Sequence, residues 1–167
     1  MAKASGDTRV SRWRPTSAPL SEDLYYNNGK RVEYKELPID KKDVVKKTAQ
    51  RIAKAVRKKY QGSTSEKVID SNETITVEFT RKGIEHICND ALLTLSGKYF
   101  SEKSMMRIKE IFDSAEYVPT DHKDKKGRKD KRFLWFTFKD TEGRNVYFKA
   151  ALGSNGKYEI HSVVDKL

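Results

Sequence analysis

Apolar and polar residues alternate in three segments of the C-terminal third of the chain. The segments 133–139, 144–150 and 157–162 are rich in aromatic and β-branched residues. Because successive side chains of a strand point to opposite faces, the alternation predicts a three-stranded antiparallel meander with one buried face. The side chains predicted to be buried are Leu134, Phe136, Phe138, Val146, Phe148, Ala150, Tyr158 and Ile160.

The other face of this meander collects side chains that can do chemistry. They are Trp135, Thr137, Lys139, Tyr147, Lys149, Glu159 and His161. A short first hairpin places Trp135 opposite Lys149, and one register of the second hairpin places Lys149 opposite His161. These three side chains then lie in one row, with Thr137 and Tyr147 in the next. We therefore expect a candidate site on this open face, although a solvated sheet face also carries polar residues.

Three other segments show the apolar spacing of helices. Their apolar stripes are Val45, Ala49, Ile52 and Val56; Ile84, Ile87, Cys88, Ala91, Leu92 and Leu95; and Met105, Ile108, Phe112 and Ala115. Asp40 and Ser101 are predicted N-caps, and Gly97 is predicted to end the second helix. Residues 74–80 alternate and predict one more strand. The fold class is therefore α+β, with helices segregated from a mostly antiparallel sheet of about four strands.

The predicted elements and the stretches between them divide the chain into an N-terminal part and a main domain. Residues 1–39 hold three of the four prolines and are expected to be a basic arm or linker. Residues 40–72 are expected to form a basic amphipathic helix followed by a linker. Residues 121–132 are almost entirely charged, which predicts a flexible loop. These boundaries leave residues 73–167 as the main domain.

The chain is strongly basic. It has 35 Lys and Arg against 24 Asp and Glu, a formal net charge of +11 at pH 7. Such a balance favours anionic partners, either nucleic acid or an acidic protein. The cations that can contact phosphates include Lys54, Arg57 and Lys58 on the first helix, Lys82 on the second, and Arg128 and Lys129 in the charged loop. An ordinary solvated face is the alternative for each of them.

Composition excludes several classes of protein. The single cysteine, Cys88, cannot form an internal disulfide framework or a thiolate cluster for zinc. No apolar run approaches the roughly 20 residues needed to cross a bilayer, and the N-terminus lacks the apolar stretch of a secretory signal. We expect a soluble, cytoplasmic protein with no membrane partner and no metal or other cofactor.

A strand-to-helix phrase gives the chain a resemblance to a known family. Residues 77–87, Val-Glu-Phe-Thr-Arg-Lys-Gly-Ile-Glu-His-Ile, precede a second helix and the meander. This order resembles the third large polyvalent protein domain, found in MuF-type phage head-morphogenesis proteins. That domain is grouped with the barnase, EndoU, colicin and RelE-like nucleases, the BECR superfamily. The resemblance covers residues 73–167.

The resemblance implies both a fold and a function. The fold it implies is a set of N-terminal helices packed on one face of a roughly four-stranded antiparallel sheet. The function is metal-independent cleavage of RNA, usually as a toxin, in the cytoplasm of a bacterium that carries the phage or mobile element. An immunity or antitoxin protein is then the expected protein partner.

Cleavage of this kind needs a base for the ribose 2′-hydroxyl, a cation at the phosphate and an acid for the leaving oxygen. His161 suits the role of base or acid because unperturbed histidine titrates near neutrality. Glu159 is a weaker candidate for the base. The phosphate can be held by Lys149 and Lys139, and a nucleobase can stack on Trp135 or Tyr147.

His86 is the histidine of the strand-to-helix phrase, so the resemblance implies a role for it. The helical spacing places it opposite the buried stripe, where an ordinary surface histidine is the alternative. Such a residue reaches a site only at the helix end or along the edge of the sheet.

A non-catalytic binding module is the second hypothesis. A domain of a phage or conjugative-element protein can bind nucleic acid or a protein through its basic arm and loop, without any of the site residues. Because nuclease-like folds also occur with replaced catalytic residues, the fold alone does not decide between the two hypotheses.

Overall fold

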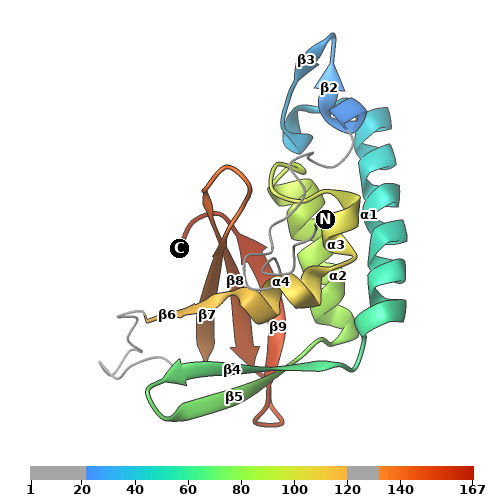
Figure 1. Ribbon diagram of the computed structural model, residues 1–167. Coiled ribbons are helices and arrows are strands. Elements are labelled where there is room, and N and C mark those ends of the chain that lie inside the picture. Colours follow the sequence, from blue (N-terminus) through green and yellow to red (C-terminus); the bar gives the residue numbers. More distant parts are fainter. Residues whose placement is uncertain (1–21, 120–131) are drawn as a thin grey trace, which may run out of the picture.

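A six-stranded sheet forms the centre of the fold (Figure 1). The structure is a computed structural model that describes residues 22–119 and 132–167. The sheet has the order β4-β5-β9-β8-β7-β6, and all neighbours are antiparallel except β5 and β9, which are parallel. The α+β class is therefore confirmed. The strands are β4 (Thr64–Asp70), β5 (Glu73–Glu78), β6 (Glu116–Val118), β7 (Phe133–Lys139), β8 (Asn145–Leu152) and β9 (Tyr158–Val164).

The sheet is larger than the sequence predicts, because two of its strands have no clear apolar pattern. β4 turns Ser65, Lys67 and Ile69 inward, so polar residues hide its alternation, and it lies where the sequence predicts a linker. β6 has three residues, too few to show a period. The expected sheet of about four antiparallel strands is corrected to six strands with one parallel pair.

The predicted buried face of the meander is confirmed at every position but one. Tyr158 is only half-buried, whereas the other predicted core residues are buried. The register between β7 and β8 is also confirmed, with Trp135 opposite Lys149 and Thr137 opposite Tyr147.

The helices flank the sheet in two groups. α1 (Ile39–Tyr60) lies beside α2 (Arg81–Asn89), and the π-helix η4 (Asp90–Thr94) continues α2. α3 (Glu102–Met105) and α4 (Ile108–Ser114) replace the single helix predicted after Ser101, and α4 crosses the strands (Figure 1). The ring of Phe112 in α4 lies 5.2 Å from the rings of both Phe136 and Phe148. α4 is therefore anchored on the buried face of the meander.

Two of the predicted helix boundaries are confirmed and one is wrong. Ser101 caps α3, since its hydroxyl accepts a hydrogen bond from the backbone N–H of Ser104 at 3.0 Å. The positive φ of Gly97, 67°, fits its place after the second helix. Asp40 does not cap α1, because the helix already begins at Ile39, after Pro38.

Residues 22–38 fold against the helices, although the sequence predicts that they belong to an arm. They form the 3₁₀ turns η2 (Glu22–Tyr25) and η3 (Tyr34–Glu36) and a small hairpin of β2 (Tyr26–Asn27) and β3 (Lys30–Arg31). Tyr25 is completely buried, and its hydroxyl donates a hydrogen bond to the carbonyl oxygen of Leu92 in η4 at 2.8 Å. One buried aromatic side chain therefore docks this segment, a feature that periodicity does not predict.

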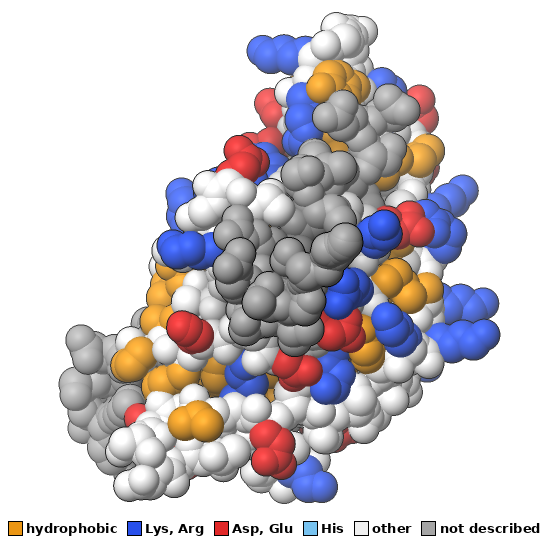
Figure 2. All heavy atoms as spheres, viewed as in Figure 1, with side chains coloured by type: hydrophobic (Ala, Val, Ile, Leu, Met, Phe, Trp, Pro, Cys, Tyr) orange, Lys and Arg blue, Asp and Glu red, His pale blue; other side chains and the backbone are white. Residues whose placement is uncertain are grey.

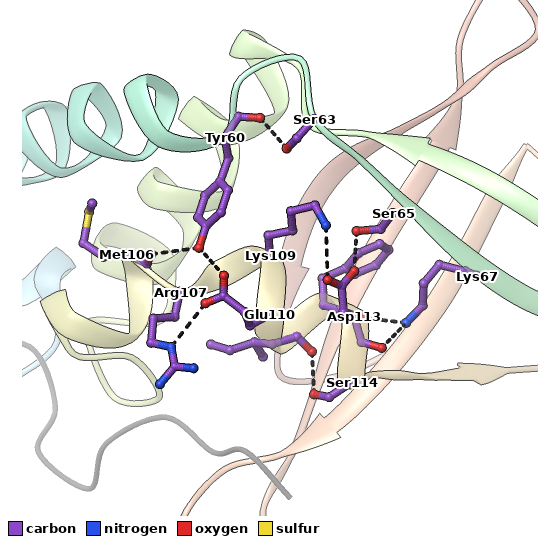
Figure 3. A network of polar contacts seen from close by, with 12 residues as sticks. Tyr60, Ser63, Ser65, Lys67, Met106, Arg107, Lys109, Glu110, Asp113 and Ser114 are labelled. Atoms are coloured by element: carbon purple, nitrogen blue, oxygen red, sulfur yellow. Dashed lines mark hydrogen bonds and ion pairs between the residues drawn. The ribbon is translucent and has the colours of Figure 1, made fainter. Parts of the chain in front are cut away.

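A buried lysine joins β4 to α4 (Figure 3). Lys67 is 5% exposed, and its ammonium donates hydrogen bonds to the carbonyl oxygens of Phe112 at 2.6 Å, Asp113 at 3.1 Å and Ala115 at 2.6 Å. Burial lowers the pKa of Lys67 to about 8, an effect that the charge of Asp113 opposes. Three carbonyl groups at the end of α4 therefore find a partner in a strand side chain.

Candidate functional site

Two histidines from different elements lie side by side where α2 packs against β9. His86 is in α2 and His161 is in β9, and their ring centroids are 5.6 Å apart. α2 runs next to β9 (Figure 1). The structure thus brings together two predicted site residues, His161 from the pattern of the sheet and His86 from the family resemblance.

A glycine allows α2 to approach β9 this closely. A Cβ atom placed on Gly83 would lie 2.2 Å from the carbonyl oxygen of Ile160, so any other residue at this position would push the helix away from the strand. His86 follows Gly83 by about one helical turn. β5 pairs with β9 only at Tyr158 and Glu159, so α2 and His86 lie along the part of β9 that β5 leaves uncovered.

His161 occupies a β-bulge. Lys149 pairs with Ser162 and Ala150 pairs with Ile160, so His161 is the extra residue on β9. The predicted pairing of Lys149 with His161 is therefore wrong by one residue. Both Ile160 and Val163 are buried, and two inward side chains three positions apart cannot fit strict alternation. The bulge accommodates that spacing, and bulges of this kind are frequent next to active sites.

Lys149 extends over two aromatic rings on the open face of the sheet. Its ammonium nitrogen lies 4.0 Å from the ring centroid of Phe133 and 5.3 Å from that of Trp135. The ring of Phe133 in turn lies 6.1 Å from the ring of His161. We call His86, His161, Lys149, Phe133 and Trp135 the histidine–lysine cluster.

The cluster changes the acidity of His161. Burial lowers the pKa of His161 below its ordinary value, and the positive charges of Lys149, His86 and Lys82 lower it further. The Nδ1 atom of His161 lies 3.3 Å from the hydroxyl oxygen of Ser162. A neutral imidazole in this setting can accept a proton at neutral pH.

Three other predicted site residues lie outside the cluster. Tyr147 is on the same strand as Lys149, two residues away, and faces Thr137. Lys139 lies at the opposite end of β7 from Phe133, and its ammonium donates a hydrogen bond to the Oδ1 atom of Asn145 at 3.1 Å. The Glu159 carboxylate lies beside Gly153 in the turn that precedes β9. The structure therefore gives Glu159 and Lys139 no position next to His161.

The predicted phosphate-binding cations fall into different groups. Lys82 is exposed on the first turn of α2 and its charge acts on His161. Lys54 and Lys58 are exposed on α1. Arg57 is instead held in an ion pair with Glu85 at 2.6 Å. Figure 2 shows Lys and Arg side chains along the side of the molecule formed by α1. Arg128 and Lys129 lie outside the described residues.

Arg57 and Lys54 also line a hollow between α1 and α2. Its volume is about 480 Å³, and Gln50, Glu85 and Asn89 complete much of its wall. Because Glu85 balances the charge of Arg57, the hollow is less cationic than its two basic residues suggest.

Two residues of the site were missed by the sequence analysis. Phe133 precedes Trp135 by two positions, so the same alternation that placed Trp135 on the open face also predicts Phe133 there. Asp90 follows His86 by four positions in the chain, and its carboxylate accepts a hydrogen bond from the backbone N–H of Val163 at 3.1 Å. The i, i+4 spacing was a signal for Asp90, although it did not reveal the contact with β9.

The described part of the chain has neither a metal-binding cluster nor a membrane-spanning helix. Within residues 22–119 and 132–167, no group of three or more His, Cys, Asp or Glu side chains is arranged to hold a metal ion. None of the helices in these ranges has the length and apolar character needed to span a bilayer.

Comparison with known proteins gives one match. The family model described as large polyvalent protein-associated domain 3 matches residues 42–164. No curated protein and no solved structure matches the chain. The matched range begins near the start of α1 and includes both β4 and the histidine–lysine cluster.

Proposed function

The chain belongs to the large polyvalent protein-associated domain 3 family, and we propose that it is a metal-independent ribonuclease domain of the toxin type. The observation that carries the proposal is the 5.6 Å separation of the His86 and His161 rings beside the Lys149 ammonium. Two imidazoles and a cation are the groups that general acid–base cleavage of RNA needs. The proposal includes membership of the BECR nucleases and an origin in a MuF-type phage or another mobile element.

The proposed reaction assigns one role to each polar member of the cluster. His161 is the base and takes the proton of a ribose 2′-hydroxyl, whose oxygen then attacks the adjacent phosphorus. Lys149 stabilises the negative charge that develops on the phosphate oxygens. His86 is the acid and donates a proton to the 5′ oxygen as its bond to phosphorus breaks. The products are a 2′,3′-cyclic phosphate end and a 5′-hydroxyl end.

The lowered pKa of His161 supports its assignment as the base. A histidine whose pKa lies below its ordinary value is mainly neutral at pH 7, and only the neutral form can accept the proton. The requirement for a 2′-hydroxyl makes RNA the substrate and excludes DNA. Trp135 and Tyr147 supply aromatic surface for a nucleobase, and Lys82 supplies positive charge for a flanking phosphate.

Cleavage of a mixed RNA pool in EDTA tests this proposal. The purified protein should produce fragments with 2′,3′-cyclic phosphate ends, and DNA of the same sequence should stay intact. His161→Ala and His86→Ala should each lower kcat by about 100-fold or more, the range in which a general acid or base contributes. Lys149→Ala should lower kcat while leaving the fold unchanged by circular dichroism.

Lys103→Ala is the matched control for Lys149→Ala. It removes the same charge from an exposed position on α3 and should leave cleavage unchanged. Absence of cleavage by the folded, unsubstituted protein, or cleavage that survives the double substitution of His86 and His161, would contradict the proposal.

The exposed lysines of α1 favour a second candidate, a non-catalytic module that binds nucleic acid. Lys54 and Lys58 are exposed on α1, on a side of the molecule where basic side chains gather (Figure 2). If this candidate is correct, the double substitution Lys54→Ala, Lys58→Ala weakens RNA binding. It also makes the slope of log K against log salt concentration less steep, by the amount expected for the loss of roughly two phosphate contacts. Replacement of His86 and His161 leaves binding intact. An immunity or antitoxin protein, acting in the bacterial cytoplasm, is a partner that only the ribonuclease proposal requires.

A further inference from the structure

We infer that Asp90 is a positioning residue of the histidine–lysine cluster, because it holds the bulge that carries His161 against the helix that carries His86. The inference rests on the proposed ribonuclease function. Asp90 itself contacts neither the phosphate nor the reacting oxygens in this scheme. Its effect on cleavage would pass through the positions of the two histidines.

The contact that supports this inference closes an open edge of β9. On one side β9 pairs with β8, with Val163 opposite Phe148. On the other side its pairing with β5 involves only Tyr158 and Glu159. The backbone N–H of Val163 donates a hydrogen bond to the Oδ2 atom of Asp90 at 3.1 Å. The carboxylate therefore takes the place of a neighbouring strand two residues beyond His161.

The helix is widened at the position of Asp90. The backbone N–H of Leu95 donates to the carbonyl oxygen of Asp90 at 2.7 Å, which is the i to i−5 bond of a π-helix. Such turns are rare and are often found at functional sites. Because Asp90 is four residues after His86, the two side chains lie on the same side of the helix. One helical face thus supplies both a histidine of the cluster and the group that holds the partner strand.

The environment of Asp90 agrees with a side chain enclosed between helix and strand. Burial raises the pKa of Asp90 above its ordinary value, while the Val163 N–H and the charge of His86 oppose the shift. The contact between the helix and β9 also includes the close approach of Gly83 to Ile160. Gly83 and Asp90 therefore lie on either side of His86 along the helix, and Ile160 and Val163 lie on either side of His161 along the strand.

Substitutions at Asp90 separate positioning from charge. Asp90→Asn keeps an oxygen that can accept the Val163 N–H, so kcat should stay within about threefold of the unsubstituted value. Asp90→Ala removes the acceptor and should lower kcat by about tenfold to 100-fold, as expected for a misplacement on the order of 1 Å, with KM nearly unchanged. Asp90→Glu keeps the carboxylate but displaces it, so its kcat should lie between those of Asp90→Asn and Asp90→Ala. This variant covers the case in which Asp90→Ala does not fold.

A structural readout makes the test independent of activity. Nuclear Overhauser contacts between the ring protons of His86 and His161 should be present in the unsubstituted protein and in Asp90→Asn, and weakened in Asp90→Ala or Asp90→Glu. The matched control is Asp165→Ala. Asp165 directly follows β9, and the substitution removes the hydrogen bond that its carboxylate accepts from the Tyr99 hydroxyl at 3.0 Å. It should leave the ring contact and kcat unchanged.

The two possible failures are distinguishable. If the unsubstituted protein does not cleave RNA, the ribonuclease proposal fails, and the ring contact alone decides the role of Asp90. If Asp90→Glu and Asp90→Ala keep the ring contact, or Asp165→Ala loses it equally, the positioning role of Asp90 is overturned. A loss of kcat in Asp90→Asn equal to that in Asp90→Ala would assign the effect to charge instead, and would also overturn the inference.

Discussion

At the scale of single residues, the chemistry of the site depends on how burial and three basic side chains act on one imidazole. Burial alone disfavours the charged form of His161, and Lys149, His86 and Lys82 add repulsion to it. The same lysine that would stabilise a phosphate thus keeps the proposed base neutral. This pairing of roles is a property of the residues and can be tested without altering the fold.

Lys149→Met is expected to raise the pKa of His161. Removal of the ammonium leaves burial, His86 and Lys82 in place, so the pKa of His161 should move toward the ordinary value of 6.5 without reaching it. Under the proposed mechanism only neutral His161 acts as the base, so the acid limb of the pH profile for residual cleavage should move to higher pH. Proton NMR titration of the His161 ring measures the shift directly. Lys103→Met is the control, and an unchanged or lower pKa in Lys149→Met would contradict the prediction.

At the scale of elements, two close contacts decide how helices meet the sheet. One is the approach of Gly83 in α2 to β9, and the other is the burial of Lys67 between β4 and α4. In both cases a single side chain, or its absence, fixes the distance between elements. Each contact therefore gives a prediction about stability.

Gly83→Ala should separate α2 from β9. The added methyl group would lie 2.2 Å from a backbone oxygen, which cannot move without shifting the strand, so we expect a loss of about 1–3 kcal/mol in the free energy of unfolding. His86 would move away from His161. Under the ribonuclease proposal, kcat should therefore fall by more than the added fraction of unfolded protein accounts for. Urea unfolding and kcat measure the two effects. Gly143→Ala is the control, because its positive φ, 79°, strains any other residue while the space around it is open. The Gly143→Ala variant should lose stability and keep its kcat.

The burial of Lys67 should appear in the pH dependence of stability. Its pKa is about 8 in the folded protein against 10.5 for an ordinary lysine. Between these values the unfolded chain holds a proton that the folded protein does not, so the free energy of unfolding rises with pH. From pH 7 to pH 9 we expect the stability of the unsubstituted protein relative to Lys67→Met to rise by about 1 kcal/mol. Urea unfolding at both pH values measures the difference. A constant or falling difference would show that Lys67 is not the buried lysine described here.

The sequence predicts elements well where one face is uniformly apolar. The strict alternation of Leu134, Phe136 and Phe138 allowed β7 and its register with β8 to be predicted. The bulge at His161 was not predicted, because it depends on Val163 turning inward, which breaks the alternation. β4 was missed for a related reason, since Lys67 is buried through hydrogen bonds to α4 that only the folded chain provides.

At the scale of the whole molecule, the N-terminal segment and the site are linked through η4. The family match begins at residue 42, yet residues 22–38 are docked on the helices. The Tyr25 hydroxyl donates a hydrogen bond to the carbonyl oxygen of Leu92, in the π-helix that begins with Asp90. The Tyr25 ring also lies against Gly97, where an added Cβ atom would be 2.6 Å from it. A segment before the matched range therefore supports the helix that contacts β9.

Substitution of Tyr25 tests whether this docking stabilises the molecule as a unit. Tyr25→Phe keeps the ring in its socket and loses only the hydrogen bond to Leu92, at a cost of about 1 kcal/mol. Tyr25→Ala leaves a cavity and should cost about 3–5 kcal/mol. If the segment and the rest of the protein unfold together, both variants shift a single urea transition monitored by circular dichroism and by tryptophan fluorescence. Loss of the segment alone would leave that transition in place. The exposed Lys30→Ala, in the same hairpin, should change neither result.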